Sequence, residues 1–479
     1  MQAPSRWVNT KIVATVGPAS FALDTIKQMA LAGTDVFRLN FAHGDWERHA
    51  QVVERVRQVE QEINRPLAIL QDLAGPKIRL GSLLKDPLHC ATGDRLRLVR
   101  QPTGRDDELT CPDVDLITDL DVGDQMLLAD GTVTLKAIAK HPDQIDLEVI
   151  VPGTIASKQG IAVPHARLQL AALTAKDLKD LDFAAQHQID FVGLSFVRRA
   201  ADINHLRQEL QRRGSQAHIV AKIEKAEALL ELDAIIRQTD AIMVARGDLG
   251  VETDIARVPL EQKRIIARCR DLGVPVITAT QMLESMRTSN RPTRAEVTDV
   301  ANAIYDGTDA VMLSAETASG SFPVQAVEMM NRIAAETEKT LPAYLPIALH
   351  EADQAKLPLV MRATVNAASL LAEQTAARLM VVATRTGRSA LALAKHRNRT
   401  PSLGLCGDMG ITRKLALYWG IVPICYPEPE NPVAYLDSVT QWAQTKQWVD
   451  VGDHLVFLIG TSWTDGGFNA VIVHEVRAS

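Results

Sequence analysis

Two stretches of sequence decide the fold: Ile219-Val-Ala-Lys222-Ile-Glu224 and Ala241-Ile-Met-Val-Ala-Arg246-Gly247-Asp248. Each is a short apolar run with charged residues at its carboxyl end. If both are parallel strands of one sheet, the helix predicted over 227–239 returns the chain to its starting edge. Glu224 and Asp248 then share a rim, about 4.8 Å apart. Two carboxylates beside a lysine suit Mg²⁺ and a phosphoryl group, whereas a rim salt bridge is the plainer alternative.

The two strands belong to a longer series of candidate strands that alternate with helices. Most are separated by stretches with a 3.6-residue apolar period, such as 174–186 and 259–271, so the pattern is strand, helix, strand. The candidate strands run over 11–17, 36–41, 67–73, 191–196, 218–224, 241–245, 275–280 and 310–314. Eight such units predict a closed (β/α)₈ TIM barrel of the α/β class.

Every predicted strand ends in polar or ionisable residues. The residues are Thr15, Arg38 with Asn40, Asp72, Ser195, Lys222 with Glu224, Arg246 with Asp248, Thr280, and Glu316. In a (β/α)₈ barrel the active site lies at the carboxyl ends of the strands. The pattern therefore predicts an active site at this end, with Glu316 as structural support.

One interval, between Leu73 and Phe191, is too long for a single helix. Its sequence alternates Val, Ile and Leu with polar residues, in the stretches 94–99, 124–133 and 144–151. These stretches predict short antiparallel strands joined by Asp-Gly turns. We expect an inserted β lid domain over 76–164, which would exclude water on closing, although a passive insertion has the same signature.

A third domain is expected after the helix predicted over 324–340 and a proline-bearing linker over 341–357. It begins with a helix over about 358–376 and the apolar strand Leu379–Ala383. The loop Thr384-Arg385-Thr386-Gly387-Arg388-Ser389 then opens a helix at Ala390. Backbone N–H groups at a helix start favour phosphate, although such loops more often only cap a helix.

The predicted domains are 1–75 with 165–340 (barrel), 76–164 (lid) and 345–479 (α/β, parallel sheet).

Composition excludes several classes of function. The 479 residues carry a net charge of −6 and no basic run, which argues against a nucleic-acid partner. The five cysteines show no metal-ligand spacing, so reduced thiols are expected. The amino terminus has no hydrophobic signal region, and no apolar run is long enough to span a bilayer. We expect a cytoplasmic protein with no membrane partner.

A series of motifs in this sequence resembles that of the pyruvate kinase family. The motifs are Lys11-Ile-Val-Ala-Thr-Val-Gly-Pro-Ala-Ser20, Phe37-Arg-Leu-Asn-Phe-Ala-His-Gly44, Asp72-Leu-Ala-Gly-Pro-Lys-Ile-Arg79, Val220-Ala-Lys-Ile-Glu224, Met243-Val-Ala-Arg-Gly-Asp-Leu-Gly250, Ala279-Thr-Gln-Met-Leu-Glu-Ser-Met286, Thr293-Arg-Ala-Glu-Val-Thr-Asp-Val-Ala-Asn302 and Leu313-Ser-Ala-Glu-Thr-Ala318. They follow the family order, with the inserted domain in the family's place.

The resemblance implies transfer of the phosphoryl group of phosphoenolpyruvate to ADP, giving pyruvate and ATP. It implies that Glu224 and Asp248 hold Mg²⁺ (or Mn²⁺) and that Lys222 and Arg38 contact the phosphoryl group. The substrate carboxylate is assigned to Gly247, Asp248 and Thr280, of which Thr280 also lies near the carbon to be protonated. The nucleotide is assigned to Thr15, Pro18, His43 and Arg79.

Some of these residues could instead have purely structural roles. Lys222 could be only a structural partner of Glu224, Thr280 could cap its loop, and His43 could be a packing residue. Thr293 with Glu296 predicts a capping box that begins a helix.

The sequence departs from the family pattern around the monovalent-cation site, which the family builds from Asn40, position 42 and Asp72. Position 42 is alanine, and position 77 is lysine where potassium-requiring members have glutamate. Since an ammonium can replace the missing cation, and Leu73 fits the same subgroup, K⁺ is not expected to be required. Gln159 and Ala162 also replace residues common in the family.

The resemblance extends to regulation and assembly. The loop 384–389 matches the family's effector-phosphate site, with 460–469 as the segment that closes over it, so a sugar phosphate or nucleotide monophosphate is the expected activator. Members of the family are usually homotetramers. Two alternatives remain: another phosphoenolpyruvate-using barrel enzyme, or a catalytically silent metabolite sensor on this scaffold.

Overall fold

Eight parallel strands close into a barrel in the computed structural model, which describes residues 8–112, 114–129, 131–164, 171–341, 357–427, 432–461 and 468–477. The strands are β1 (Lys11–Val16), β2 (Val36–Asn40), β3 (Ala68–Asp72), β12 (Phe191–Leu194), β13 (His218–Ile223), β14 (Ala241–Ala245), β15 (Val276–Ala279) and β16 (Ala310–Leu313). They follow one another around the ring in chain order, and β1 pairs with β16. The predicted (β/α)₈ barrel is confirmed.

Seven of the eight strands end one or two residues earlier than predicted, and for two of them the backbone shows the cause. β12 stops at Leu194 and β15 at Ala279, because Phe196 (φ 55°) and Thr280 (φ 69°) turn into the left-handed region. This backbone conformation is costly for residues with a side chain and takes the chain out of the sheet.

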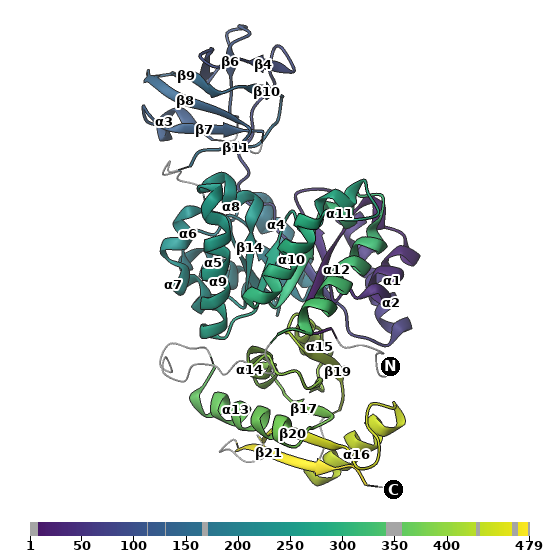
Figure 1. The fold of residues 1–479 in the computed structure, drawn as a ribbon. Coiled ribbons are helices and arrows are strands. Elements are labelled where there is room, and N and C mark those ends of the chain that lie inside the picture. The colour runs from purple at the N-terminus through teal and green to yellow at the C-terminus, as the bar shows by residue number, and fades with distance from the viewer. Residues whose placement is uncertain are drawn as a thin grey trace.

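Helices surround the barrel (Figure 1). They are α1 (Leu23–Ala32), α2 (Trp46–Ile63), α4 (Ala175–Gln186), α5 (Ala200–Arg212), α6 (Ala226–Leu230), α7 (Leu232–Gln238), α8 (Arg246–Glu252), α9 (Val258–Leu272), α10 (Arg294–Asp306), α11 (Ala315–Ala318) and α12 (Pro323–Glu338). Thr293 and Glu296 form the predicted capping box of α10. Among the described residues, no helix is long and apolar enough to cross a bilayer.

The helix predicted over 227–239 is in fact two helices, α6 and α7. Glu231 between them has φ −105° and ψ 20°, which interrupts the helical hydrogen bonds. Ala228, Leu232 and Ile235 are still buried on one face. An apolar period reports which face is buried, and a break in the backbone leaves that pattern intact.

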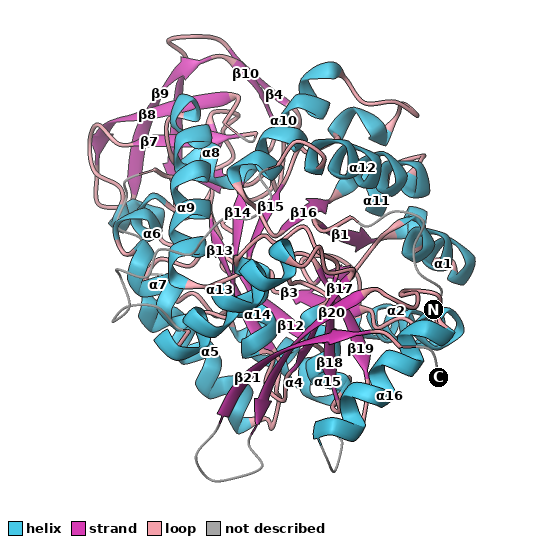
Figure 2. Cartoon of the chain, turned by 60° about the horizontal axis from the view of Figure 1, so that its bottom comes forward, coloured by secondary structure: helices cyan, strands magenta, loops and turns pink. Residues whose placement is uncertain are grey.

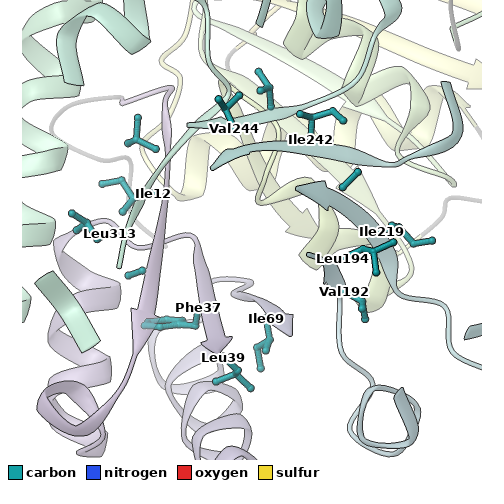
Figure 3. Close-up of a cluster of buried hydrophobic side chains, with 14 of the residues drawn as sticks. Ile12, Phe37, Leu39, Ile69, Val192, Leu194, Ile219, Ile242, Val244 and Leu313 are labelled. Atoms are coloured by element: carbon teal, nitrogen blue, oxygen red, sulfur yellow. The ribbon is translucent and has the colours of Figure 1, made fainter. Parts of the chain in front are cut away.

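Strand residues alternate between the two sides of the barrel wall. Phe37, Leu39 and Ile69 point outward and pack against the helices (Figure 3). Leu70 and Val220 belong to the cluster that fills the interior. Since side chains alternate along a strand, the interior positions continue toward the carboxyl ends as the polar residues of the site.

The inserted segment forms a β domain with its own core, at the end of the barrel drawn uppermost in Figure 1. Its elements are β4 (Leu88–Cys90), β5 (Arg95–Val99), β6 (Glu108–Leu109), α3 (Leu116–Asp119), β7 (Gln125–Leu128), β8 (Val133–Lys140), β9 (Gln144–Val151), β10 (Gly153–Ile155) and β11 (Ile161–Ala162). The pairs are antiparallel as predicted, except that β5 and β6 are parallel. The predicted Asp-Gly turn at 130–131 lies partly outside the described residues.

The C-terminal domain contains a five-stranded sheet in the order β19-β18-β17-β20-β21. Its elements are α13 (Leu359–Gln374), β17 (Leu379–Ala383), α14 (Arg388–Lys395), β18 (Ser402–Cys406), α15 (Met409–Leu415), β19 (Ile421–Cys425), α16 (Pro432–Thr445), β20 (His454–Thr461) and β21 (Phe468–Glu475). The sheet is parallel except for β21, which pairs antiparallel with β20. The expected linker is described only at Leu341 and Leu357, and the expected closing segment 460–469 is described only at its ends.

This domain lies across the barrel end opposite the lid (Figures 1 and 2). Lys395 of α14 reaches Asp309, which precedes β16, and Arg413 of α15 reaches Glu60 of α2. Helix α14 begins at Arg388, two residues before the predicted start, because Gly387 takes the N-cap position with φ 81°. The barrel is therefore held between a lid at its carboxyl end and a docked domain at its amino end.

Candidate active site

Lys222 lies at the centre of the carboxyl end of the barrel. Its Nζ is 2.9 Å from Glu224 Oε1 and 3.3 Å from Asp72 Oδ1, and it donates a hydrogen bond of 2.7 Å to Ser195 Oγ. Ser195 in turn donates to the carbonyl of Leu73. Burial alone would lower the pKa of Lys222, but the charges of Asp72 and Glu224 outweigh it and raise the pKa above its ordinary value. The ammonium is therefore a fixed positive charge.

Arg38 is held beside this ammonium. Its Nε donates to Asp72 Oδ2 over 2.7 Å, and Nη1 donates to the Thr15 hydroxyl over 3.0 Å. Burial would raise the pKa of Asp72, but Lys222 and Arg38 lower it below its ordinary value. Asp72 therefore stays ionised behind two cations and orients both.

Glu224 and Asp248 provide carboxylates on neighbouring strands, as predicted. Glu224 directly follows β13 and accepts a 2.7 Å hydrogen bond from the Phe196 amide, while Asp248 lies in the first turn of α8, after β14. Burial raises the pKa of Glu224, and the charge of Asp248 adds to the shift although Lys222 opposes it. Two close acidic groups, one buried, fit a divalent cation that takes its other oxygens from substrate and water. No cluster of three or more possible protein ligands occurs in the described part of the chain.

Thr280 and Gly247 meet across β15 and β14. The Gly247 amide donates a 2.8 Å hydrogen bond to Thr280 Oγ1, which donates to the Ala279 carbonyl. Arg246 also binds the carbonyls of Ala279 and Thr280 and pairs with Asp299. This network holds Thr280 at φ 69°, a strained value of the kind that recurs at functional sites. The Gly247 amide is already engaged, so a substrate carboxylate would have to exchange with the hydroxyl.

One cavity of about 660 Å³ joins most of the predicted residues. Its wall includes the predicted catalytic, metal and nucleotide residues Thr15, Pro18, Arg38, Asn40, His43, Lys222, Glu224, Asp248 and Thr280. Asp72 lies behind this wall, bonded to Arg38. The volume is within the usual range for small-molecule sites.

Two predicted residues lie apart from this cavity, in the stem that leads to the lid. Arg79 donates to the Lys158 carbonyl over 3.0 Å and bridges to the Gly160 backbone. Lys77 lines a smaller cavity of about 90 Å³ under the lid, which shares only Asp248 with the main one. The side-chain oxygen of Gln159 accepts a hydrogen bond from the Ala156 amide. The structure therefore does not bring Lys77 together with Asn40 and Asp72.

Ser195, Arg246 and Asp299 support the site, although the sequence predicts no particular role for any of them. Ser195 and Arg246 do end predicted strands, so their positions carried a signal. Asp299 lies in α10, 53 residues from Arg246 in sequence, and only the folded chain pairs them. Glu316 accepts hydrogen bonds from the amides of Leu283 and Ser314, as expected of a supporting residue.

A (β/α)₈ barrel that presents two carboxylates, a partly buried ammonium and a guanidinium at its carboxyl end is typical of phosphotransferases that work with a divalent metal. Family models agree: "Pyruvate kinase, barrel domain" matches residues 7–327 and "Pyruvate kinase, alpha/beta domain" matches residues 362–474. The chain belongs to the pyruvate kinase family.

Individual relatives support this assignment over nearly the whole chain. A pyruvate kinase of Agrobacterium vitis is 40% identical over 98% of this chain and 97% of its own length. Pyruvate kinase 2 of Synechocystis is 40% identical over 98% of this chain and 79% of its own. A crystal structure of a pyruvate kinase from Cryptosporidium parvum superposes with a TM-score of 0.91 at 31% identity, covering 98% of this chain and 96% of the other.

Proposed function

We propose that this chain transfers the phosphoryl group of phosphoenolpyruvate to ADP, giving pyruvate and ATP, the last step of glycolysis. The observation that carries the proposal is the ammonium of Lys222, fixed by Glu224, Asp72 and Ser195 on the wall of the main cavity. A loose phosphoryl-transfer transition state requires positioned positive charge more than covalent chemistry.

Glu224 and Asp248 are the proposed ligands of Mg²⁺ (or Mn²⁺). When bound, the cation would supply positive charge to the phosphate and enolate oxygens of the substrate. The requirement for a divalent metal is general in the family. Burial raises the pKa of Glu224 most, and the charge of Asp248 raises it further, so a cation shared by the two carboxylates would relieve their repulsion.

The remaining roles follow from the positions of the side chains. Lys222 contacts the phosphoryl group and steadies the developing enolate, and Arg38, oriented by Asp72, binds the phosphate. Thr280 binds the substrate carboxylate and lies near the carbon that is protonated, where a water relay is the better acid. The adenine nucleotide occupies the side of the cavity lined by Thr15, Pro18 and His43. Arg79 joins the nucleotide only if the lid moves.

Further proposals concern the monovalent cation, the assembly and the location of the protein. We propose that K⁺ is not required, because the side chain of Ala42 has no oxygen to offer a cation, and because Lys77, which lines the small cavity beside Asp248, supplies a positive charge of its own. A phosphorylated effector, a homotetramer and a cytoplasmic location follow from the family resemblance. The proposed domains are 1–75 with 165–340, 76–164 and 345–479.

A coupled assay for pyruvate from phosphoenolpyruvate, ADP and MgCl₂ tests the reaction. Robust pyruvate formation is expected. Carboxylation, condensation or rearrangement of phosphoenolpyruvate in place of pyruvate would indicate another barrel enzyme, and binding without turnover would indicate a sensor. Repeating the assay in buffer free of sodium and potassium tests the ion requirement, since a large rise on adding KCl contradicts potassium independence.

A further inference from the structure

Two of the five cysteines meet in the sheet of the C-terminal domain. Cys406 is the last residue of β18 and Cys425 is the last residue of β19, and the parallel pairing of these strands makes them Cα partners. The two strands lie side by side in Figure 2. Both sulfurs are thiols. Cys90 and Cys111 lie in the lid and Cys269 in α9, so the pair is separate from the other cysteines.

The two cysteine side chains leave the sheet on the same face. Gly404, two residues before Cys406, marks this face, because side chains two residues apart along a strand point the same way. A Cβ at Gly404 would lie 2.7 Å from Ile421 Cγ2 and 2.9 Å from Leu415 Cδ1. Leu415 belongs to α15, so this helix covers the face on which the cysteines lie.

Solvent reaches one cysteine of the pair and not the other. Cys406 is 4% exposed, whereas Cys425 is exposed because β19 is the edge strand of the sheet. Cys406 Sγ donates to the Arg385 carbonyl over 3.9 Å, and Cys425 Sγ donates to the Gly407 carbonyl over 3.8 Å. Since Gly407 directly follows Cys406, the exposed sulfur points to the turn that begins at the buried cysteine.

We propose that Cys406 and Cys425 form a redox-active dithiol, which hydrogen peroxide converts to a reversible disulfide that restrains α15. Neighbouring strands lie about 4.8 Å apart, which is within the range of about 4.4–6.8 Å between the Cα atoms of disulfide-bonded cysteines. An exposed thiol beside a second, resolving cysteine is the usual arrangement of a redox-sensitive pair.

The reaction proceeds in two steps. The Cys425 thiolate attacks one peroxide oxygen and the O–O bond breaks. The departing hydroxide takes up the thiol proton as water, which leaves a sulfenic acid on Cys425. The Cys406 thiolate then attacks the Cys425 sulfur, the S–O bond breaks, and a second water leaves with the Cys406 proton. The two thiols lose two electrons and two protons in total, and the peroxide gains both.

The disulfide would close a loop that contains all of α15. This helix follows Cys406 directly, its N-cap is Asp408, and its Arg413 pairs with Glu60 of the barrel. A cross-link from Cys406 to Cys425 therefore ties both ends of the segment that docks on the barrel. Because such a loop restricts the unfolded chain, the oxidised protein is expected to unfold at a temperature about 5 °C higher than the reduced protein.

Thiol counting on the full chain tests the proposal. The reduced protein, at low micromolar concentration, is treated with a slight excess of hydrogen peroxide, and catalase then removes the peroxide. After denaturation in urea, the number of thiols is expected to fall by two, from the five cysteines of the chain to three. Mass spectrometry of the digested protein should show a Cys406–Cys425 cross-link, and dithiothreitol should restore all five thiols.

Cys406→Ser and Cys425→Ser, each a change of one atom, should abolish the paired loss of two thiols and the rise in unfolding temperature. The matched control is Cys111→Ser, which removes a half-buried cysteine of the lid and should still lose two thiols.

A fall of two thiols in Cys406→Ser, a cross-link to another cysteine, or disulfide-linked dimers on a non-reducing gel in place of the internal bond would overturn the dithiol. An unchanged thiol count would do the same. Equal unfolding temperatures for the oxidised and reduced proteins would overturn the restraint on α15. These measurements need no turnover, so their outcome is independent of the proposed phosphoryl transfer.

Discussion

Lys222, which is partly buried, and Lys395, which is fully buried, are ion-paired lysines at opposite ends of the same barrel. Lys222 meets two carboxylates that raise its pKa, and it opens onto a cavity. Lys395 is fully buried against Asp309, and burial lowers the pKa of its ammonium. Both lysines have oxygen partners, but Lys222 also has room for a substrate beside it, whereas Lys395 is enclosed by protein. The carboxyl end of the barrel therefore serves chemistry and the amino end serves stability and docking, as expected for this fold.

The largest effect is expected from Lys222→Met. Removing the ammonium takes away charge stabilisation at the phosphoryl group, so kcat should fall about 10³-fold. Steady-state kinetics in the coupled assay measure the change. The control is Lys225→Met, which removes a neighbouring lysine that pairs with Glu252 outside the main cavity. A loss in the control as large as that in Lys222→Met would break the assignment.

At the other end, Asp309→Asn should destabilise the fold and leave the chemistry largely intact. Asp309 balances Lys395 and Arg397 in a buried interface, so its neutralisation leaves two cations without a counter-charge. A loss of about 3 kcal/mol in the free energy of unfolding is expected. Urea denaturation measures it, with kcat of the folded fraction as the second readout. Unchanged stability would show that this cluster does not hold the domains.

The same interface should make stability sensitive to acid. Burial, with the charge of Arg362, lowers the pKa of His396 from 6.5 to about 4. The unfolded chain therefore takes up this proton near pH 6.5 and the folded chain only near pH 4. The contribution of His396 to stability is full above pH 6.5 and declines as the pH falls.

We expect this decline to cost about 2 kcal/mol between pH 6.5 and pH 5. His396→Gln should remove it, and urea denaturation of both proteins across this range measures the difference. Parallel pH curves for the two proteins would contradict the prediction.

The smallest effect is expected from Ser195→Ala at the catalytic end. Ser195 touches Lys222 and the Leu73 carbonyl but does not line the main cavity, so it acts as a positioning residue. Its loss should lower kcat about tenfold, with little change in KM, and Ser195→Thr should restore part of it. A change in KM alone would indicate a role in substrate binding.

Local periodicity explains how much of the fold was predictable. The alternation of side chains along each strand is a property of a few adjacent residues, so Lys222, Glu224, Arg38 and Asp72 could be placed at one rim from their spacing. The apolar periodicity did not reveal the break at Glu231, because the buried face continues through the break. The periodicity also predicted that β15 extends beyond Ala279, because it carries no sign of the left-handed turn at Thr280.

The sequence by itself determined the eight strand units, the inserted and C-terminal domains, and the charged residues that follow each strand, since short-range pattern and composition suffice for these. Tertiary structure alone decided that Lys77 lies under the lid, that Asp299 pairs with Arg246, and that Arg388 lines a cavity together with residues of the barrel. These contacts join segments far apart in the chain. They depend on how whole elements pack, which no local spacing records.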